Sequence, residues 1–181
     1  LIGKLTGQLS KKYEQQMLLR LKNRKQWWME MHLKIWLECI GYLLVTAATF
    51  LIYAFCTKSA IEGINLKVLQ DCLGLEINEK NLRIFSMVIV FFLALLALAY
   101  IQYIISLAIN AVIGILVSIV VLVSSVYQIH PFLIGNYFMC IRQMMFAMDD
   151  VGFLTQGAVS VGIIFFMAVI GYQILKRKDL F

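Results

Sequence analysis

The sequence predicts an all-α fold, a polytopic bundle of membrane-spanning helices. Residues 84–141 contain no Lys, Arg, Asp or Glu, and the whole chain is 62% hydrophobic with a single proline. Roughly 20 apolar residues of helix cross a hydrocarbon core about 30 Å thick. Residues 84–127 form an uncharged run of 44 residues, which is long enough to cross twice. No soluble domain of this size has a core that could bury such a helix on all sides.

Residues 1–34 are expected to form an amphipathic cytoplasmic helix that precedes the membrane domain. Apolar residues recur there at helical spacing between lysines and arginines. Such a face either stays solvated and only sets topology, or docks on a membrane surface or a partner protein. Eight of the 16 basic residues precede Glu38, and three more are residues 176–178. This pattern fits the positive-inside rule, so we expect both ends to be cytoplasmic and no nucleic acid to bind.

Residues 35–181 are expected to form the transmembrane domain. Its four spans lie at about 35–55, 84–104, 105–127 and 157–175. Trp27, Trp28 and Trp36 stand where the first span begins, as in an interfacial aromatic belt. Glu38, in the first turn of that span, either stays hydrated or pairs with Lys34 one helical turn earlier.

The loop 57–83 has balanced charge and suits the outer face, so the second and third spans form a tight hairpin whose turn is cytoplasmic. Near that turn, Asn110 is the polar residue expected to be most buried. An amide in lipid is more often packing glue between helices than a substrate ligand. Gly114 and Ser118 are spaced four apart on the third span and would let another helix approach closely.

Residues 128–148 are apolar but interrupted, and we interpret them as a re-entrant extracytoplasmic segment near an outer gate. The interruptions that we assign to the gate are His130, Pro131, Asn136 and Arg142. Proline disfavours helix at the residue before it, and irregular backbone at membrane depth is tolerated where protein covers it. Arg142 is expected to pair with Asp149 and Asp150 and so to anchor the segment's end.

Catalytic and metal-binding motifs are not found in the sequence. His32 and His130 have no carboxylate or cysteine at ligand spacing, so we expect neither an enzyme nor a cofactor or metal site. The cysteines have no paired spacing, and we read them as ordinary apolar residues. A bridge between Cys72 and Cys140, which would share one face of the membrane, stays open.

The layout resembles the C-terminal two thirds of an ABC-2 type transporter permease. Residues 17–28, with the sequence MLLRLKNRKQWW, are similar to the cytoplasmic segment before the third span of small permeases that serve bacteriocin or peptide export and immunity. The ending KRKDLF of residues 176–181 is similar to the ending common in that family. Since such permeases usually have six spans, the resemblance implies that the first two precede Leu1.

The resemblance also implies the partners and their contacts. It implies a dimer of permease chains in which an ABC ATP-binding subunit carries the ATP and magnesium. The residues implied to contact that subunit are Met17, Arg20, Lys22 and Arg24. The uncharged spans favour a peptide or lipid-like cargo, moved outward. The alternatives are a non-transporting four-span accessory, scaffold or immunity protein, and a pore-former such as a holin, which would need a polar stripe on a span.

Overall fold

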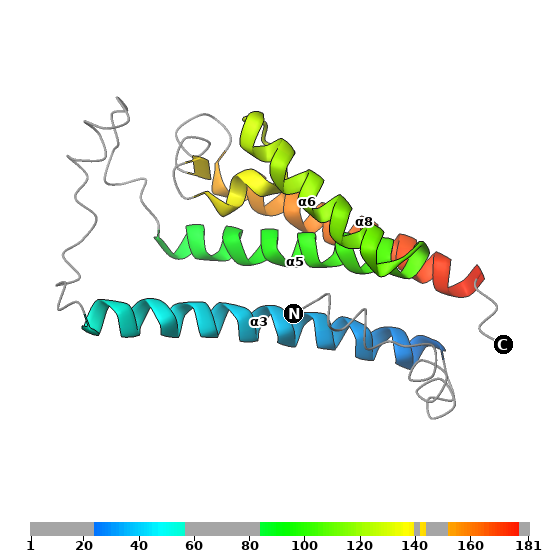
Figure 1. The fold of residues 1–181 in the computed structure, drawn as a ribbon. Helices are drawn as coiled ribbons and strands as arrows, with labels where there is room; N and C mark the ends of the chain where they lie inside the picture. The colour runs from blue at the N-terminus through cyan, green and yellow to red at the C-terminus, as the bar shows by residue number, and fades with distance from the viewer. Residues whose placement is uncertain (1–23, 57–83, 140–141, 144–151, 178–181) are drawn as a thin grey trace.

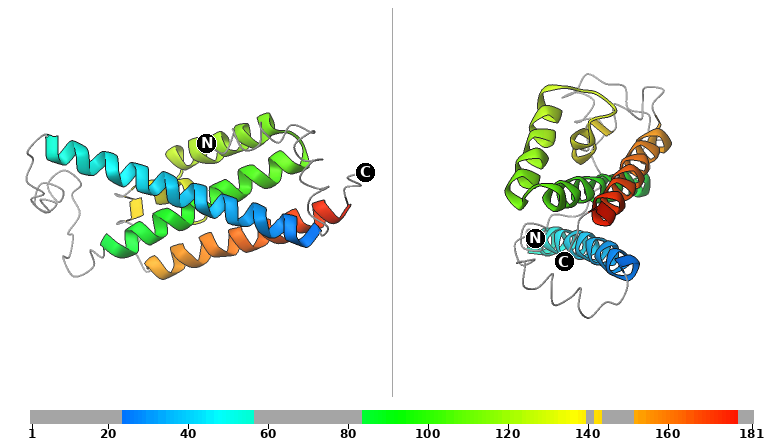
Figure 2. Two further views of the ribbon diagram at one scale, coloured as in Figure 1. Left: turned by 90° about the horizontal axis from the view of Figure 1, so that it is seen from below. Right: turned by 90° about the vertical axis from the view of Figure 1, so that its right-hand side faces the viewer.

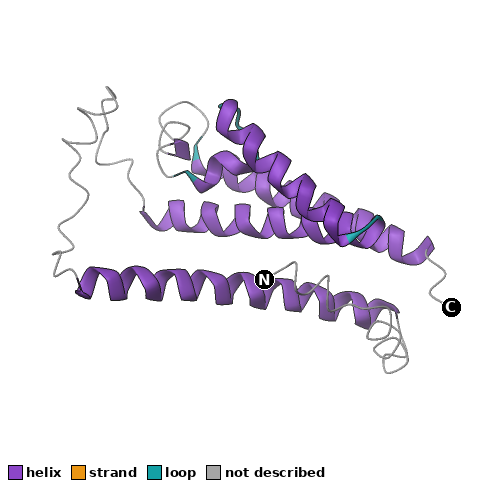
Figure 3. Cartoon of the chain, in the orientation of Figure 1, coloured by secondary structure: helices purple, strands orange, loops and turns teal. Residues whose placement is uncertain are grey.

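The computed structural model describes residues 24–56, 84–139, 142–143 and 152–177. All regular structure in these residues is helical, without strands (Figure 3). The elements in order are α3 (Arg24–Cys56), α5 (Ile84–Ala108), α6 (Ala111–Tyr127), the 3-10 helix η2 (Ile134–Phe138) and α8 (Phe153–Arg177).

The helices form three layers with α5 in the middle. Figure 1 shows α3 running antiparallel to α5 along one side. The end-on view in Figure 2 places α8 beside α5, and α6 with η2 on the side of α5 that faces away from α3. α5 packs against each of the other four elements. Its small and apolar side chains, such as Ala94, Ala97 and Ala99, are fully buried and allow this close approach on several sides.

The two ends of the bundle differ in charge. At one end, which we call the basic end, α3 begins with Arg24 and Lys25 and α8 finishes with Lys176 and Arg177. At the opposite end, which we call the fold-back end, Arg142 is the one charged residue among those that the structure describes. Between the ends, α5 and α6 carry no charged side chain.

Three helices are long and apolar enough to span a membrane. The candidate spans are Lys25–Tyr53, Phe85–Ala108 and Phe153–Lys176. α6 is equally apolar but has only 17 residues, which gives it a length of about 26 Å at about 1.5 Å per residue. It is therefore shorter than a hydrocarbon core of about 30 Å.

The turn of the hairpin lies later in the chain than the sequence pattern placed it. α5 continues through residues 105–108, and the break comes at Ile109 and Asn110, where Asn110 is extended with φ −164° and ψ 152°. Ser106 is still helical, and its hydroxyl donates to the carbonyl of Gln102 one turn earlier, 2.6 Å away. The expected boundary between 104 and 105 therefore falls inside α5.

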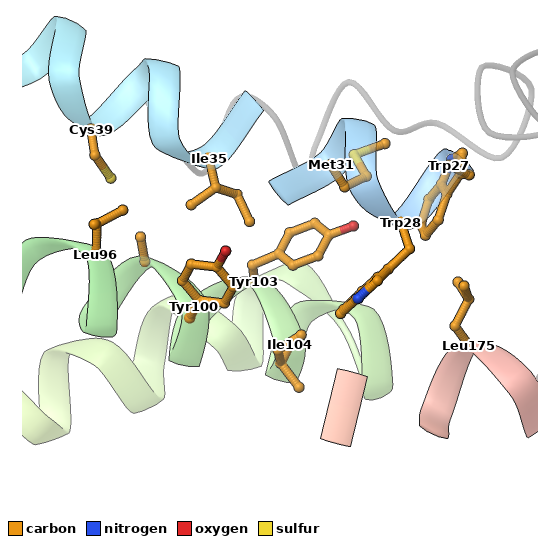
Figure 4. Packing of buried hydrophobic residues seen from close by; sticks show 11 residues of the cluster. Trp27, Trp28, Met31, Ile35, Cys39, Leu96, Tyr100, Tyr103, Ile104 and Leu175 are labelled. Atoms are coloured by element: carbon orange, nitrogen blue, oxygen red, sulfur yellow. The ribbon is translucent and has the colours of Figure 1, made fainter. Parts of the chain in front are cut away.

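α3 also begins earlier than the expected span. It runs without a break from Arg24 through the expected boundary at residues 34 and 35. Its first turns pack on the bundle: Trp27 and Trp28 are 2% and 8% exposed and join a buried cluster with residues of α5 and α8 (Figure 4). The expectation that these two tryptophans form an interfacial belt is therefore wrong, because protein, not the membrane interface, covers their rings. Trp36 is exposed and meets Phe92 of α5 edge to face, with ring centroids 5.9 Å apart.

Candidate functional site

The candidate site is the stretch that follows α6, residues 128–139, which we call the fold-back segment. α6 stops at Tyr127, and the chain then turns at Pro131 and Phe132 and continues into η2. η2 packs against both α6 and α5. The chain thus returns onto the helix that it has just left. Proline at position 131 explains the stop, because it disfavours helical geometry in His130.

Arg142 holds the fold-back segment to the end of α6. Its guanidinium donates to the backbone carbonyls of Ser125 and Val126 and to the side-chain oxygen of Asn136. The bonds to Val126 and Asn136 measure 2.8 and 2.6 Å. The last carbonyls of a helix have no partner within the helix and carry the negative end of its dipole. A cation at this position therefore satisfies two of them and is stabilised by the dipole.

Asn136 is the second residue that ties the segment together. It is fully buried, and its amide nitrogen donates to the carbonyls of Gln128 and His130 at 3.1 and 2.9 Å. Tyr137, also fully buried, donates its hydroxyl to the carbonyl of Pro131. The His130 carbonyl also accepts from the Leu133 amide at 3.0 Å. For the carbonyls of Gln128 and Pro131, the partners that the structure gives are the side chains of Asn136 and Tyr137.

The inner side of the segment is fitted closely to the two helices beneath it. Ile134 and Tyr137 belong to a buried apolar cluster with residues of α5, among them Val90 and Ile101. At Gly135 a Cβ atom would overlap the Ser125 hydroxyl and lie 2.6 Å from the Ser125 Cβ. Only glycine allows η2 to approach α6 this closely.

Two buried glutamines continue the polar region toward α8. The Gln143 side chain donates to the Tyr137 carbonyl, and the Gln156 side chain lies 3.4 Å from the Gln143 carbonyl. Both residues are almost wholly buried, and the amide oxygen of each has no hydrogen-bond partner. Ser160 donates back to the Gln156 carbonyl at 3.1 Å. A polar layer thus passes from α6 through η2 to α8.

The outer side of the segment carries large apolar side chains beside the polar Gln128 and His130. Ile129 and Phe132 are 55% and 69% exposed, and Tyr127 at the end of α6 is also exposed. His130 lies between them, is exposed, and accepts a bond of 3.3 Å from the Phe132 amide through Nδ1. The segment thus satisfies the carbonyls of Gln128, His130 and Pro131 with its own side chains, and it exposes large apolar side chains together with the polar side chains of Gln128 and His130. Satisfied backbone carbonyls are what a lipid environment demands of irregular backbone.

All four residues assigned to the gate therefore lie at one place. Asn136 and Arg142 bond each other, and Asn136 and Tyr137 bind the backbone of His130 and Pro131. The expected acidic partners of Arg142, Asp149 and Asp150, lie outside the described residues. The partners that the structure does give Arg142 are carbonyl and amide oxygens.

The three residues assigned to helix packing divide into two groups. Gly114 and Ser118 are buried, and Ser118 donates to the Gly114 carbonyl at 3.0 Å. At Gly114 a Cβ atom would overlap the Ser106 hydroxyl and lie 2.7 Å from the Gln102 carbonyl oxygen, so α5 touches α6 there. Asn110 is exposed and makes no side-chain capping bond. The expectation that Asn110 is the most buried polar residue is wrong, because it lies in the turn and not in a span.

Of the residues assigned to the ATP-binding partner, Met17, Arg20 and Lys22 lie outside the described residues. Arg24 is the first residue of α3, at the basic end. Cys39 is buried and Cys56 exposed, both as free thiols, while Cys72 and Cys140 are outside the described part of the chain. Among the described residues, no group of three or more His, Cys, Asp or Glu side chains could hold a metal ion.

Sequence reasoning missed a contact at the basic end. His32 Nδ1 lies 2.5 Å from the Tyr100 hydroxyl, and the two rings stack with centroids 5.2 Å apart. The Trp28 ring meets His32 edge to face. A tyrosine in the middle of an uncharged helix is the signal that could have suggested a polar partner, since buried tyrosine hydroxyls usually find one. Nothing in the sequence identifies that partner as His32. Glu38, half-exposed on the same helix, has one buried carboxylate oxygen without a hydrogen-bond partner.

The three long apolar helices, with α3 and α8 packed on α5 and the polar layer at one end, place this chain among the α-helical membrane proteins. Beyond that class, no protein-family model, curated protein or solved structure matches the chain.

Proposed function

We propose that this chain is a transmembrane permease subunit of an ABC exporter, driven by a separate ATP-binding subunit. The observation that carries the proposal is the fold-back segment. A simple scaffold of spanning helices needs no broken, self-satisfied segment between its third and fourth helices. A permease that must open on one side has a use for such a segment, because polar bonds that can be exchanged tie it to the end of α6 while its inner side packs on α5.

The helix ends support the proposed topology. The described Lys and Arg residues gather at the basic end, with Arg142 alone at the other. By the positive-inside rule, the basic end faces the cytoplasm and the fold-back segment lies in the outer leaflet. α6 is too short to reach across a typical core by itself. The fold-back segment beside its end would fill the remaining depth of the outer leaflet with protein.

The cargo and assembly follow from the uncharged helix surfaces. α5 and α6 offer no charged side chain to an ion or a strongly polar solute, so an amphipathic peptide or a lipid-like molecule is the better cargo. Large apolar side chains are exposed along α3, α6 and α8. In the proposed dimer, lipid covers part of this surface and the second permease chain covers the rest. The catalytic residues, ATP and magnesium all belong to the ATP-binding subunit.

A charge-reversal experiment tests the cytoplasmic contact. Arg20→Glu with Arg24→Glu should abolish co-purification of the ATP-binding subunit from a mild detergent extract, because two cations facing the partner become anions. The matched control reverses Lys58 and Lys67, two lysines of the loop expected on the outer face, and should leave co-purification intact. Retention of the partner by the Arg20 and Arg24 variant would refute the assigned contact. An extract without any ATP-binding partner would favour the accessory, scaffold or immunity protein instead.

A further inference from the structure

The long helix α3 is attached to the bundle through one half only. Its buried residues all lie between Arg24 and Cys39, and they are Trp27, Trp28, Met31, Ile35 and Cys39. From Ile40 to Cys56, none of the side chains that the structure describes is buried. In Figure 2, α3 crosses α5 obliquely, and its far end extends beyond the packed layers.

At the centre of the attached half, the side chain of Trp28 packs against Gly171 of α8. At Gly171 of α8, a Cβ atom would overlap Cη2 of the Trp28 ring and Cδ1 of Ile104, and it would lie 3.1 Å from Trp28 Cζ2. The indole of Trp28 therefore occupies the space that any other residue at 171 would fill. Figure 4 shows the Trp28 ring reaching from α3 toward Ile104 of α5 and the α8 ribbon.

Polar contacts fix the orientation of this joint. His32, one turn after Trp28, approaches the Tyr100 hydroxyl of α5 to 2.5 Å and stacks on its ring. Trp28 meets His32 edge to face with centroids 4.5 Å apart. Aromatic rings of α3 and α5 thus meet here, and α8 takes part through Gly171, which lies against the Trp28 ring. Beyond Cys39, no described side chain of α3 is buried against the bundle in this way.

We propose that the seat of Trp28 at Gly171 is a pivot, about which α3 swings as a rigid rod relative to α5 and α8. The end of α3 near Cys56 moves, while the end near Arg24 keeps its place. The motion belongs to this chain alone, so the inference stands whether or not an ATP-binding subunit drives it.

Spin-label distances between α3 and α8 test the pivot in the full chain, with its native cysteines replaced by alanine and the protein in lipid nanodiscs. One label pair, Met29→Cys with Gln173→Cys, reports the basic end. The other, Phe55→Cys with Leu154→Cys, reports the opposite end of the same two helices. All four sites are exposed. We expect a narrow distance distribution for the first pair and a broad one for the second. Equal widths at both ends would overturn the pivot.

Substitutions that exchange side-chain volume between positions 171 and 28 test whether the specific contact of Trp28 with Gly171, and not packing in general, holds this end of α3. Gly171→Leu should expel the Trp28 ring and broaden the basic-end distribution to the width seen at the other end. A double variant, Trp28→Ala with Ile104→Ala, added to Gly171→Leu removes both side chains that the new Cβ atom would overlap and should restore the narrow distribution. The control is Gly162→Leu, because Gly162 lies on the same helix and a Cβ atom there would meet no neighbour within 4 Å. A basic-end distribution unchanged by Gly171→Leu, or not restored by the double variant, would contradict the proposal.

Discussion

Arg142→Leu is expected to release the fold-back segment and to lower the free energy of unfolding by about 2–3 kcal/mol. The loss is large because three acceptors depend on this guanidinium: the carbonyls of Ser125 and Val126 and the side-chain oxygen of Asn136. The α6 terminus would also lose the cation that opposes its dipole. Thermal unfolding in detergent micelles, followed by circular dichroism, measures the change.

Two variants make the Arg142 result specific. Arg142→Lys keeps the charge but lacks the planar fork that reaches three acceptors, so its stability should fall between those of the wild type and Arg142→Leu. Lys25→Leu removes an exposed cation at the basic end and should leave the unfolding temperature nearly unchanged. If Arg142→Leu unfolds at the wild-type temperature, the guanidinium does not hold the segment.

Gly114→Leu is expected to separate the α5–α6 hairpin and to destabilise the protein by about 1–3 kcal/mol, the usual cost of overpacking. The new side chain would meet the backbone of α5, with the Gln102 carbonyl oxygen 2.7 Å and the Ser106 nitrogen 3.1 Å from its Cβ. Backbone atoms of a packed helix cannot move aside as a flexible side chain can. The helix must therefore shift, which also disturbs the contacts of η2 with both helices.

The control substitution for this prediction should leave stability unchanged or raise it, and not lower it. Gly162→Leu places the same side chain on α8 in open space, and leucine favours helix over glycine by roughly 0.8 kcal/mol. Stability should therefore be unchanged or slightly raised, as measured by the same thermal unfolding. Equal destabilisation by both substitutions would show that the cost comes from leucine on the helix surface and not from the α5–α6 contact.

The helical class and the layout around the hairpin could be predicted because hydrophobic runs and charge positions depend on the sequence alone. The exact position of the turn between α5 and α6 could not be predicted. Gln102, Ser106 and Asn110 all look alike as polar residues in an apolar run, yet only Asn110 leaves the helix. Ser106 stays inside the helix, with its hydroxyl bonded to the Gln102 carbonyl, and no sequence pattern distinguishes it from Asn110.

The residues that interrupt the helix in the fold-back segment could also be predicted, but their hydrogen-bond partners could not. His130, Pro131, Asn136 and Arg142 stand out as breaks in an apolar stretch, and they do lie together. The acceptors of Arg142 are mostly backbone carbonyls, which every residue has and which no residue type indicates. The prediction that Trp27 and Trp28 form an interfacial belt was wrong for a related reason. An interfacial ring and a ring seated against Gly171 have the same place in the sequence, and only the partner helix distinguishes them.

The most direct test of this account asks whether the fold-back segment lies within the membrane. Ile129→Cys and Phe132→Cys, made singly without the native cysteines, are treated in intact cells with a membrane-impermeant maleimide. Ser59→Cys, in the loop expected on the outer face, is the control. Ile129 and Phe132 are both exposed on the surface of the chain, so their protection must come from lipid or from the second chain of the proposed dimer, and not from the fold of this chain. We expect slow labelling of both and fast labelling of Ser59→Cys. Labelling of Ile129→Cys and Phe132→Cys at the rate of the control would place the segment in water and contradict the account.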